Sequence, residues 1–250
     1  MPRIRADIVE EGRRLLALAE GAGVPLRLLG GVAVRLRGDA LPPPLRREFA
    51  DLDFVAARGS SAGAACLLDD AGYEPDSAVN ALHGKRRLIF YDPEHGRKID
   101  VFVGEFNMCH KIPLDRLDLE PATVPLAELL LTKLQVVELN DKDVRDTFAL
   151  LVAHPVEEHD GDAVNAARVA ELCAADWGLW RTITANLAAC AERAGGYGLD
   201  TADVERIRGR VAGLLDRVEA EPKSRAWRLR ARIGERIRWY ELPEEVGEDV

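Results

Sequence analysis

The chain has 250 residues and a formal net charge of −9, and 47% of its residues are hydrophobic while 31% are charged. A chain of this length can bury a stable core without disulfides or a structural metal. Its negative charge argues against a protein that coats nucleic acid by bulk electrostatics. No apolar run approaches the roughly 20 residues that span a bilayer. The start also lacks the apolar core of a signal peptide, so we expect a cytoplasmic protein without a membrane partner.

Helix and strand signals alternate in the first half of the chain. In chain order they predict an amphipathic helix over 4–20, a strand over 26–29, a helix over 32–36 after two glycines, a strand over 51–55 and a helix over about 62–71. Two β-type runs follow at 87–91 and 98–103. They are joined by Asp92-Pro93-Glu94-His95-Gly96, so we expect a hairpin.

Strand signals disappear after about residue 120. The remaining pattern predicts helices over 126–139, 142–151, 164–175, 179–194, 201–219 and 224–240, followed by an acidic, frayed tail over 241–250. We therefore predict an α+β protein with two domains. Residues 1–120 would form a small mixed sheet with helices, and residues 121–250 an all-helical domain.

The strand beginning at residue 51 reads Asp51-Leu52-Asp53-Phe54-Val55. Successive strand residues point to opposite faces, so both aspartates project from one side while Leu52 and Phe54 enter the core. Two carboxylates in one small volume repel unless a cation lies between them, and hard oxygen ligands suit Mg²⁺ or Mn²⁺. A lone Asp-x-Asp is also typical of a solvent-facing strand, so the pair needs support from elsewhere in the chain.

Asp100 provides that support. It is the only charge in the middle of the run Lys98 to Val103. An acid inside a strand requires a partner or a metal. Asp51, Asp53 and Asp100 together therefore predict a divalent-metal site.

Lys133 is an anomaly of a different kind, because it lies in the apolar stripe of the predicted helix over 126–139. Its stem could pack there while its ammonium reaches water. Alternatively, the ammonium emerges in a cleft and meets a triphosphate. Asn140 looks like a new helix N-cap, which puts Asp143 and Asp146 on one face of the next helix. Acids are also favoured there by the helix dipole alone, so both are secondary candidates.

This order of motifs resembles the nucleotidyltransferase superfamily with a polymerase-β-like palm. The resemblance is carried by Leu29-Gly30-Gly31, Asp51-Leu52-Asp53 and Asp100, over roughly residues 20–105. The helix containing Lys133 and the segment Lys142-Asp143-Val144-Arg145-Asp146 are similar to the AbiEii-like branch, which includes toxins of toxin–antitoxin systems. Gly30-Gly31 with the following Arg35 also resembles the CCA-adding and poly(A)-polymerase branch.

The resemblance implies an Mg²⁺-dependent enzyme that transfers NMP from an NTP to a hydroxyl. Asp51, Asp53 and Asp100 would bind the metals, and Asp100 would also help to deprotonate the acceptor. Backbone N–H groups of Gly30 and Gly31 would hold the triphosphate, with Lys133 neutralising the leaving pyrophosphate. Arg35, Asp143 and Asp146 are further candidates for the nucleotide site.

Three functions remain open at this level. The acceptor is RNA, such as a tRNA end as in toxin relatives, or a small hydroxylated molecule as in antibiotic-modifying relatives; the third alternative is a non-enzymatic binding module. A toxin would have a small antitoxin-like protein as a partner. The basic stripe of the predicted helix over 224–240 could hold RNA phosphates, and it could equally be a solvated face with intrachain salt bridges.

Overall fold

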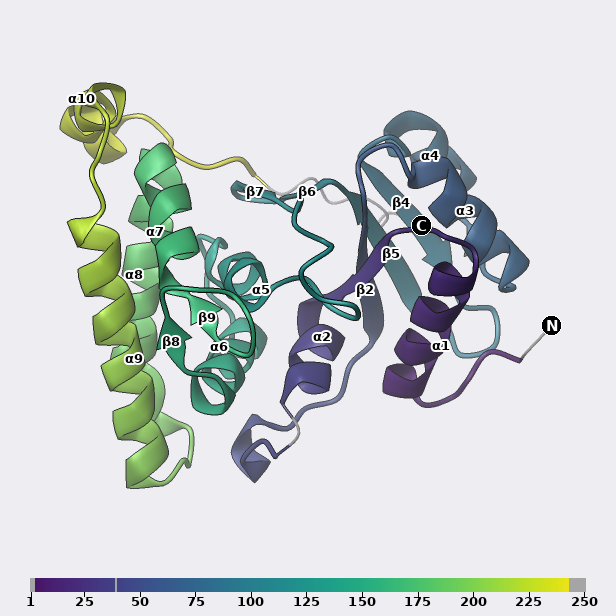
Figure 1. Cartoon of the computed structure of the whole chain (residues 1–250), viewed down its shortest axis with the longest axis horizontal. Helices are drawn as coiled ribbons and strands as arrows, with labels where there is room; N and C mark the ends of the chain where they lie inside the picture. The colour runs from purple at the N-terminus through teal and green to yellow at the C-terminus, as the bar shows by residue number, and fades with distance from the viewer. Residues whose placement is uncertain (1–2, 39, 243–250) are drawn as a thin grey trace.

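A five-stranded mixed sheet forms the N-terminal half of the protein in a computed structural model that describes residues 3–38 and 40–242 (Figure 1). The predicted tail beyond residue 242 lies outside the described residues. The strand order is β1 (Leu26–Leu29), β2 (Asp51–Ala56), β5 (Lys98–Val103), β4 (Arg87–Tyr91) and β3 (Glu74–Pro75). Only β2 and β5 run parallel, and β4 and β5 form the predicted hairpin. The mixed α+β class is confirmed.

The two faces of the sheet differ because side chains alternate along each strand. Leu52 and Phe54 of β2 are fully buried, as predicted. Helix α1 (Ile8–Gly21) packs on this apolar face, where Gly12 lies against Leu28 and Leu52. Helix α3 (Ser61–Asp70) packs beside it against β3 and β4 (Figure 1). The opposite face carries the three predicted aspartates.

Three helices lie close to that polar side: α2 (Gly30–Arg37), α5 (Leu126–Leu134) and α6 (Asp141–Ala153). Beyond them, α7 (Ala166–Ala175), α8 (Trp177–Arg193) and α9 (Thr201–Ala220) pack against one another, and α10 (Arg225–Ile233) lies at the far end of the molecule (Figure 1). Among the described residues, no helix is long and apolar enough to cross a membrane.

A single hydrophobic cluster runs from Ile4 to Val218 and so includes both halves of the chain. The segment after residue 120 also touches the sheet, since Leu28 forms a parallel bridge with Thr123. The Leu28 N–H donates to the Ala122 carbonyl at 2.8 Å, and the Val124 N–H donates to the Leu28 carbonyl at 3.1 Å. The domain boundary near residue 120 stays a prediction.

Two predicted helices extend too far at their C-terminal ends, and the helix predicted over 4–20 starts only at Ile8, after the N-cap Asp7. The helix over 126–139 ends at Leu134, because Asn186 of α8 donates to the carbonyls of Leu134 and Val136 at 2.8 and 2.6 Å. These bonds satisfy carbonyls that a continued helix would have used. The helix over 224–240 ends at Ile233, where Gly234 has a φ of +60°, and a 3₁₀ turn (Gly234–Arg236) follows. A residue with a positive φ cannot continue a right-handed helix, and glycine adopts such a φ without a steric penalty.

The prediction of an all-helical second half is also wrong. Two short strands, β8 (Val156–Glu157) and β9 (Val164–Asn165), pair in parallel, so the helix expected from residue 164 starts at Ala166. In the first half the helix expected from Val32 starts at Gly30. The sequence pattern missed helix α4 (Ser77–His83), the hairpin of β6 (Glu105–Asn107) and β7 (Lys111–Pro113), and the 3₁₀ turn at Pro43–Leu45. All are short, and their patterns are correspondingly weak.

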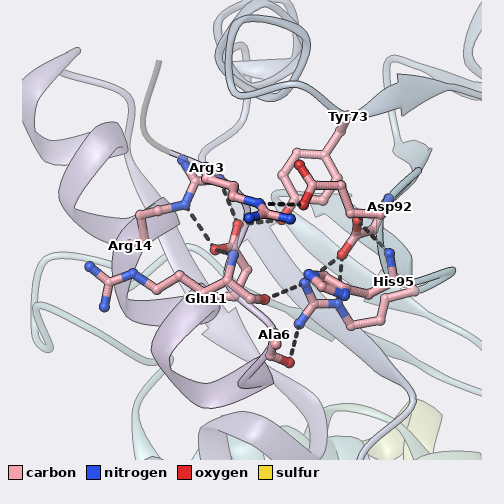
Figure 2. A network of polar contacts seen from close by, with 10 residues as sticks. Arg3, Ala6, Glu11, Arg14, Tyr73, Asp92 and His95 are labelled. Carbon is pink, nitrogen blue, oxygen red and sulfur yellow. Dashed lines mark hydrogen bonds and ion pairs between the residues drawn. The ribbon is translucent and has the colours of Figure 1, made fainter.

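A buried polar network fastens the N-terminus to the edge of the sheet (Figure 2). Glu11 of α1 is fully buried, where Arg14 donates to it at 2.8 Å and Tyr73 donates its hydroxyl proton. In the turn between β4 and β5, Arg97 pairs with the buried Asp92 and donates to the Ala6 carbonyl at 3.2 Å. Every buried charge here has a partner, so the network is structural and lies on the α1 side of the sheet.

Candidate nucleotide site

Strands β2 and β5 bring the predicted carboxylates together. Their parallel register places Asp53 directly beside Asp100, and Asp51 beside Lys98. Paired residues of adjacent strands share a face. Asp51 is exposed at the start of β2, Asp53 is partly buried, and only 5% of Asp100 is accessible. The three aspartates predicted from the sequence therefore form one row on the polar face.

Asp53 is the most perturbed carboxyl of the row. Burial, together with the charges of Asp51 and Asp100, raises its pKa from 3.8 to about 7, although Lys133 and Arg87 act in the opposite direction. Desolvation and like charges both disfavour the ionised form of an acid. The site thus carries an excess of negative potential at Asp53, which a cation would relieve.

Asp100 has the partner that an acid inside a strand requires. Arg87 of β4 binds both of its carboxylate oxygens, with Nε 2.8 Å from Oδ1, and Lys98 Nζ lies 3.8 Å from Oδ2. Arg87 is the diagonal cross-strand neighbour of Asp100 in the β4–β5 hairpin. Such diagonal pairs are within reach of long side chains. The hairpin could have suggested this pair from the sequence.

The glycine pair lies directly against the row of acids. Gly30 follows β1 without a loop and has a φ of +67°, a conformation that favours glycine. A Cβ on Gly30 would collide with the Asp53 carboxylate, and one on Gly31 would collide with the guanidinium of Arg47 and the ring of Phe49. The Asp53 carboxylate and the Arg47 guanidinium therefore pack directly on the backbone at the start of α2, which is possible only because both residues lack side chains.

Arg47 was not predicted from the sequence. It lies in the segment before β2, where Nε and Nη2 donate to the two oxygens of Asp146 at 2.9 and 2.7 Å. Lys133 Nζ lies 2.9 Å from the same Asp146 and 3.4 Å from Asp143. Two cations from distant segments thus meet at the buried Asp146 beside Gly31. The only sequence signal for Arg47 is its place four residues before the first aspartate of the Asp-x-Asp strand.

The charges of this cluster reinforce one another. Burial alone would lower the pKa of Lys133, but the charges of Asp146 and Asp143 raise it above its ordinary value. Burial would likewise raise the pKa of Asp146, yet the hydrogen bonds of Arg47 and the charge of Lys133 lower it. Lys133 and Asp146 are accordingly both ionised at neutral pH. Lys133 is not a snorkelling lysine, because its ammonium is paired inside the protein with only 11% of the side chain exposed.

Arg35 lies apart from these groups. Its side chain is exposed on α2 and donates to the Gly38 carbonyl at 3.1 Å. Asp143 is held by its own helix end, where Asn140 caps α6 and donates to Asp143 at 2.7 Å. The structure thus groups Asp51, Asp53, Asp100, Gly30, Gly31, Lys133 and Asp146, with Asp143 at the margin and Arg35 outside.

A divalent cation fits part of this donor set. Among the described residues, no group of three or more His, Cys, Asp or Glu side chains is arranged to hold a metal ion. Asp51 and Asp53 nevertheless offer hard oxygen ligands where negative charge accumulates. A cation at Asp100 would have to share that carboxylate with Arg87. The residues therefore suit a cation held mainly by Asp51 and Asp53.

No protein-family model matches this chain, and no curated protein matches it. Its function is accordingly inferred from the geometry and chemistry of the site.

Proposed function

We propose that the protein is a nucleotidyltransferase that transfers NMP from an NTP to a hydroxyl acceptor, and that its sheet and α2 form a polymerase-β-like palm. One observation carries this proposal. The Asp53 carboxylate lies against Gly30 at the start of α2, while Arg47 lies against Gly31 and shares Asp146 with Lys133. Acidic and basic groups thus flank one backbone cradle, as binding of a metal–triphosphate requires.

The charge of each residue at the start of α2 determines its proposed role. Asp51 and Asp53 would hold Mg²⁺ or Mn²⁺, which supplies positive charge to the triphosphate. N–H groups at the start of α2 would bind phosphate oxygens, because glycine allows a close approach. Lys133 and Arg47 would neutralise charge on the leaving pyrophosphate. Asp146 is a positioning residue that holds both cations beside Gly31.

The reaction is a displacement at the α-phosphorus of the NTP. The acceptor oxygen forms the new P–O bond, the bond to pyrophosphate breaks, and the hydroxyl proton passes to Asp100. A carboxylate has about four acceptor positions. Arg87 uses two of those on Asp100, so the others can accept the hydroxyl.

The test is incubation of the full chain with each radiolabelled NTP, Mg²⁺ and total RNA, followed by separation of the labelled products. Asp51→Asn and Asp53→Asn should each abolish label transfer, because they remove a ligand charge while keeping the shape of the side chain. Glu74→Gln, an exposed acid on β3 of the same sheet, is the matched control and should retain activity.

Calorimetry of Mg·ATP binding separates the alternatives. Unchanged nucleotide binding and unchanged turnover in both aspartate variants would reject this site. Nucleotide binding that depends on Asp53 without any label transfer, to RNA or to small hydroxylated molecules, would favour the non-enzymatic module.

A further inference from the structure

A cavity of about 200 Å³ adjoins the row of acids at its Arg87 end. Its walls come from α4, β4, β5, β6 and the C-terminal segment, and include Arg86, Arg87, Phe102, Asn107, Glu241 and Leu242. We call it the Asn107 cavity. Arg87 links it to the site, because the guanidinium that binds Asp100 also lies over the Phe102 ring, 5.0 Å from its centroid.

The polar lining of the Asn107 cavity has spare binding capacity. Asn107 Oδ1 is buried and has no hydrogen-bond partner among the described residues. A buried acceptor left unpaired costs about 1–3 kcal/mol. Asn107 lines the cavity, so a rotation of its side chain that turns Oδ1 into the cavity would let a ligand hydroxyl satisfy this acceptor. Glu105 and Glu241 add two more acceptors to the lining.

Part of the lining is basic. Arg86 is exposed, and no carboxylate among residues 3–38 and 40–242 pairs with it. His83, at the end of α4, also lines the cavity. Most other arginines of this acidic protein pair with carboxylates or carbonyls, so Arg86 is available for an anion.

The size of the cavity limits what it can take. A cavity of about 150 Å³ accommodates a benzene molecule, so 200 Å³ holds one ring with a few substituents. Leu242 and Met108 supply apolar surface. The backbone of Glu241 donates to the Cys109 carbonyl at 2.9 Å, which fixes the C-terminal segment as part of the wall.

We propose that the Asn107 cavity is the acceptor subsite of the transferase and binds a hydroxyl-bearing ring with a neighbouring phosphate, of which ribose 5-phosphate is the simplest form. The inference rests on the proposed function. Ligand hydroxyls would donate to Asn107 Oδ1, the phosphate would bind Arg86 and His83, and a further hydroxyl would face Asp100 past Arg87. Such a unit is supplied by a free sugar phosphate or by the terminal nucleotide of an RNA.

Titration calorimetry of the full chain with ribose 5-phosphate tests this assignment. Arg86→Gln removes a charge-assisted hydrogen bond and should weaken binding about tenfold. Leu242→Trp should abolish binding by filling the cavity. Matched controls are Arg3→Gln, an arginine with 87% of its side chain exposed, and Leu119→Trp, a leucine that is 45% exposed; both should bind as the parent does. Ribose without phosphate should bind more weakly and be insensitive to Arg86→Gln.

A second set of measurements identifies the source of the ligand. It also distinguishes binding in the Asn107 cavity from binding at the start of α2. A single-stranded RNA hexamer that binds more tightly than ribose 5-phosphate, and loses affinity in the same variants, assigns the subsite to an RNA terminus. Tighter binding of ribose 5-phosphate than of the hexamer assigns it to a free sugar phosphate.

Lys133→Gln should weaken ATP binding and leave ribose 5-phosphate binding unchanged. Ribose 5-phosphate binding that depends on Lys133 and not on Arg86 or Leu242 would overturn the proposal. If the parent fails to bind ATP while the Arg86 and Leu242 effects hold, the proposed function fails and the binding site stands.

Discussion

The ionisation of Asp53 makes the stability of the folded protein depend on pH. Its pKa is raised from 3.8 to about 7 by burial and by two neighbouring acids, so the folded state keeps a proton that the unfolded chain loses above pH 4. Stability is therefore lost as the pH rises between those two values. At pH 8, without a divalent cation, the ionised Asp53 is a destabilising group.

The first prediction concerns that group. At pH 8 in EDTA, Asp53→Asn should unfold at a higher temperature than the parent. Its unfolding free energy should exceed that of the parent by at most about 4 kcal/mol. Mg²⁺ should stabilise the parent at pH 8, much less at pH 6, and the variant hardly at all, since a proton and the cation compete for Asp53. Thermal unfolding measured at both pH values, with and without Mg²⁺, checks this. An equal Mg²⁺ effect on parent and variant would remove Asp53 as a ligand.

The second prediction concerns Gly30, for which the chain offers a matched control. Gly30 and Gly96 have φ values of +67° and +65°, but a Cβ on Gly96 would meet no atom within 4 Å, whereas one on Gly30 would collide with Asp53. Gly96→Ala should cost only the backbone strain of about 1–2 kcal/mol. Gly30→Ala should cost more and also abolish ATP binding. Chemical denaturation measures the stability of both variants, and calorimetry measures their ATP affinity. Equal losses in the two variants would mean that Gly30 is needed only for the backbone conformation of the turn.

At the scale of elements, α5 and α6 hold two cations beside α2. Asp146 is the common partner of Lys133 and Arg47, and only 4% of its side chain is exposed. Removing one member of a buried ionic group leaves the other charges uncompensated. Asp146 is thus the carboxylate that joins α5, α6 and the segment before β2, beside the weaker pair of Lys133 with Asp143 and the bond from Arg145 to the Pro44 carbonyl.

The third prediction follows from this role. Asp146→Asn should destabilise the fold by about 3 kcal/mol. It should not weaken ATP binding as severely as Lys133→Gln, because both cations remain present. Denaturant unfolding and calorimetry measure the two effects. ATP affinity that falls as far in Asp146→Asn as in Lys133→Gln would show that the presence of the two cations is not sufficient and that ATP binding requires the Asp146 charge.

The fourth prediction concerns α10 and the turn after it. Lys223 and the arginines up to Arg238 supply seven cations against one acid, Glu235, which pairs with Arg181 at 2.6 Å. Within the part of the chain that the structure describes, no carboxylate pairs with Arg225, Arg228, Arg232 or Arg236. Replacing these four with Gln should weaken RNA binding and reduce the log–log salt slope by about 0.7 to 0.9 per lost contact. ATP binding should be unchanged, and a parental RNA affinity and slope would favour a small acceptor.

At the scale of the whole molecule, the polar face of the sheet and the helical half depend on each other. The hydrophobic cluster extends from Ile4 to Val218, and the segment around Thr123 pairs with β1. The fifth prediction is that the chain unfolds in urea in one transition. Tryptophan fluorescence, which reports on the second half, and far-UV circular dichroism should therefore give the same midpoint. All four tryptophans lie between residues 177 and 239. Two separate transitions would support the domain boundary near residue 120 instead.

The sequence by itself was sufficient to predict the longer helices, the strands β1, β2, β4 and β5, and the identity of the acids. Alternation along 51–55 predicted the burial of Leu52 and Phe54, and the hairpin over 87–103 followed from its two β-type runs and the polar turn between them. These features depend on neighbours in the chain, so periodicity is sufficient to predict them.

Tertiary structure alone decided how the charges are paired. Arg47 meets Lys133 at Asp146 across nearly 100 residues of sequence, and no local pattern encodes such a contact. The end of α5 is likewise set by Asn186 from another helix, and the need for glycine at positions 30 and 31 arises from where Asp53 and Arg47 lie. Burial then raised the pKa of Asp53, because desolvation is a property of the assembled fold and not of the residue.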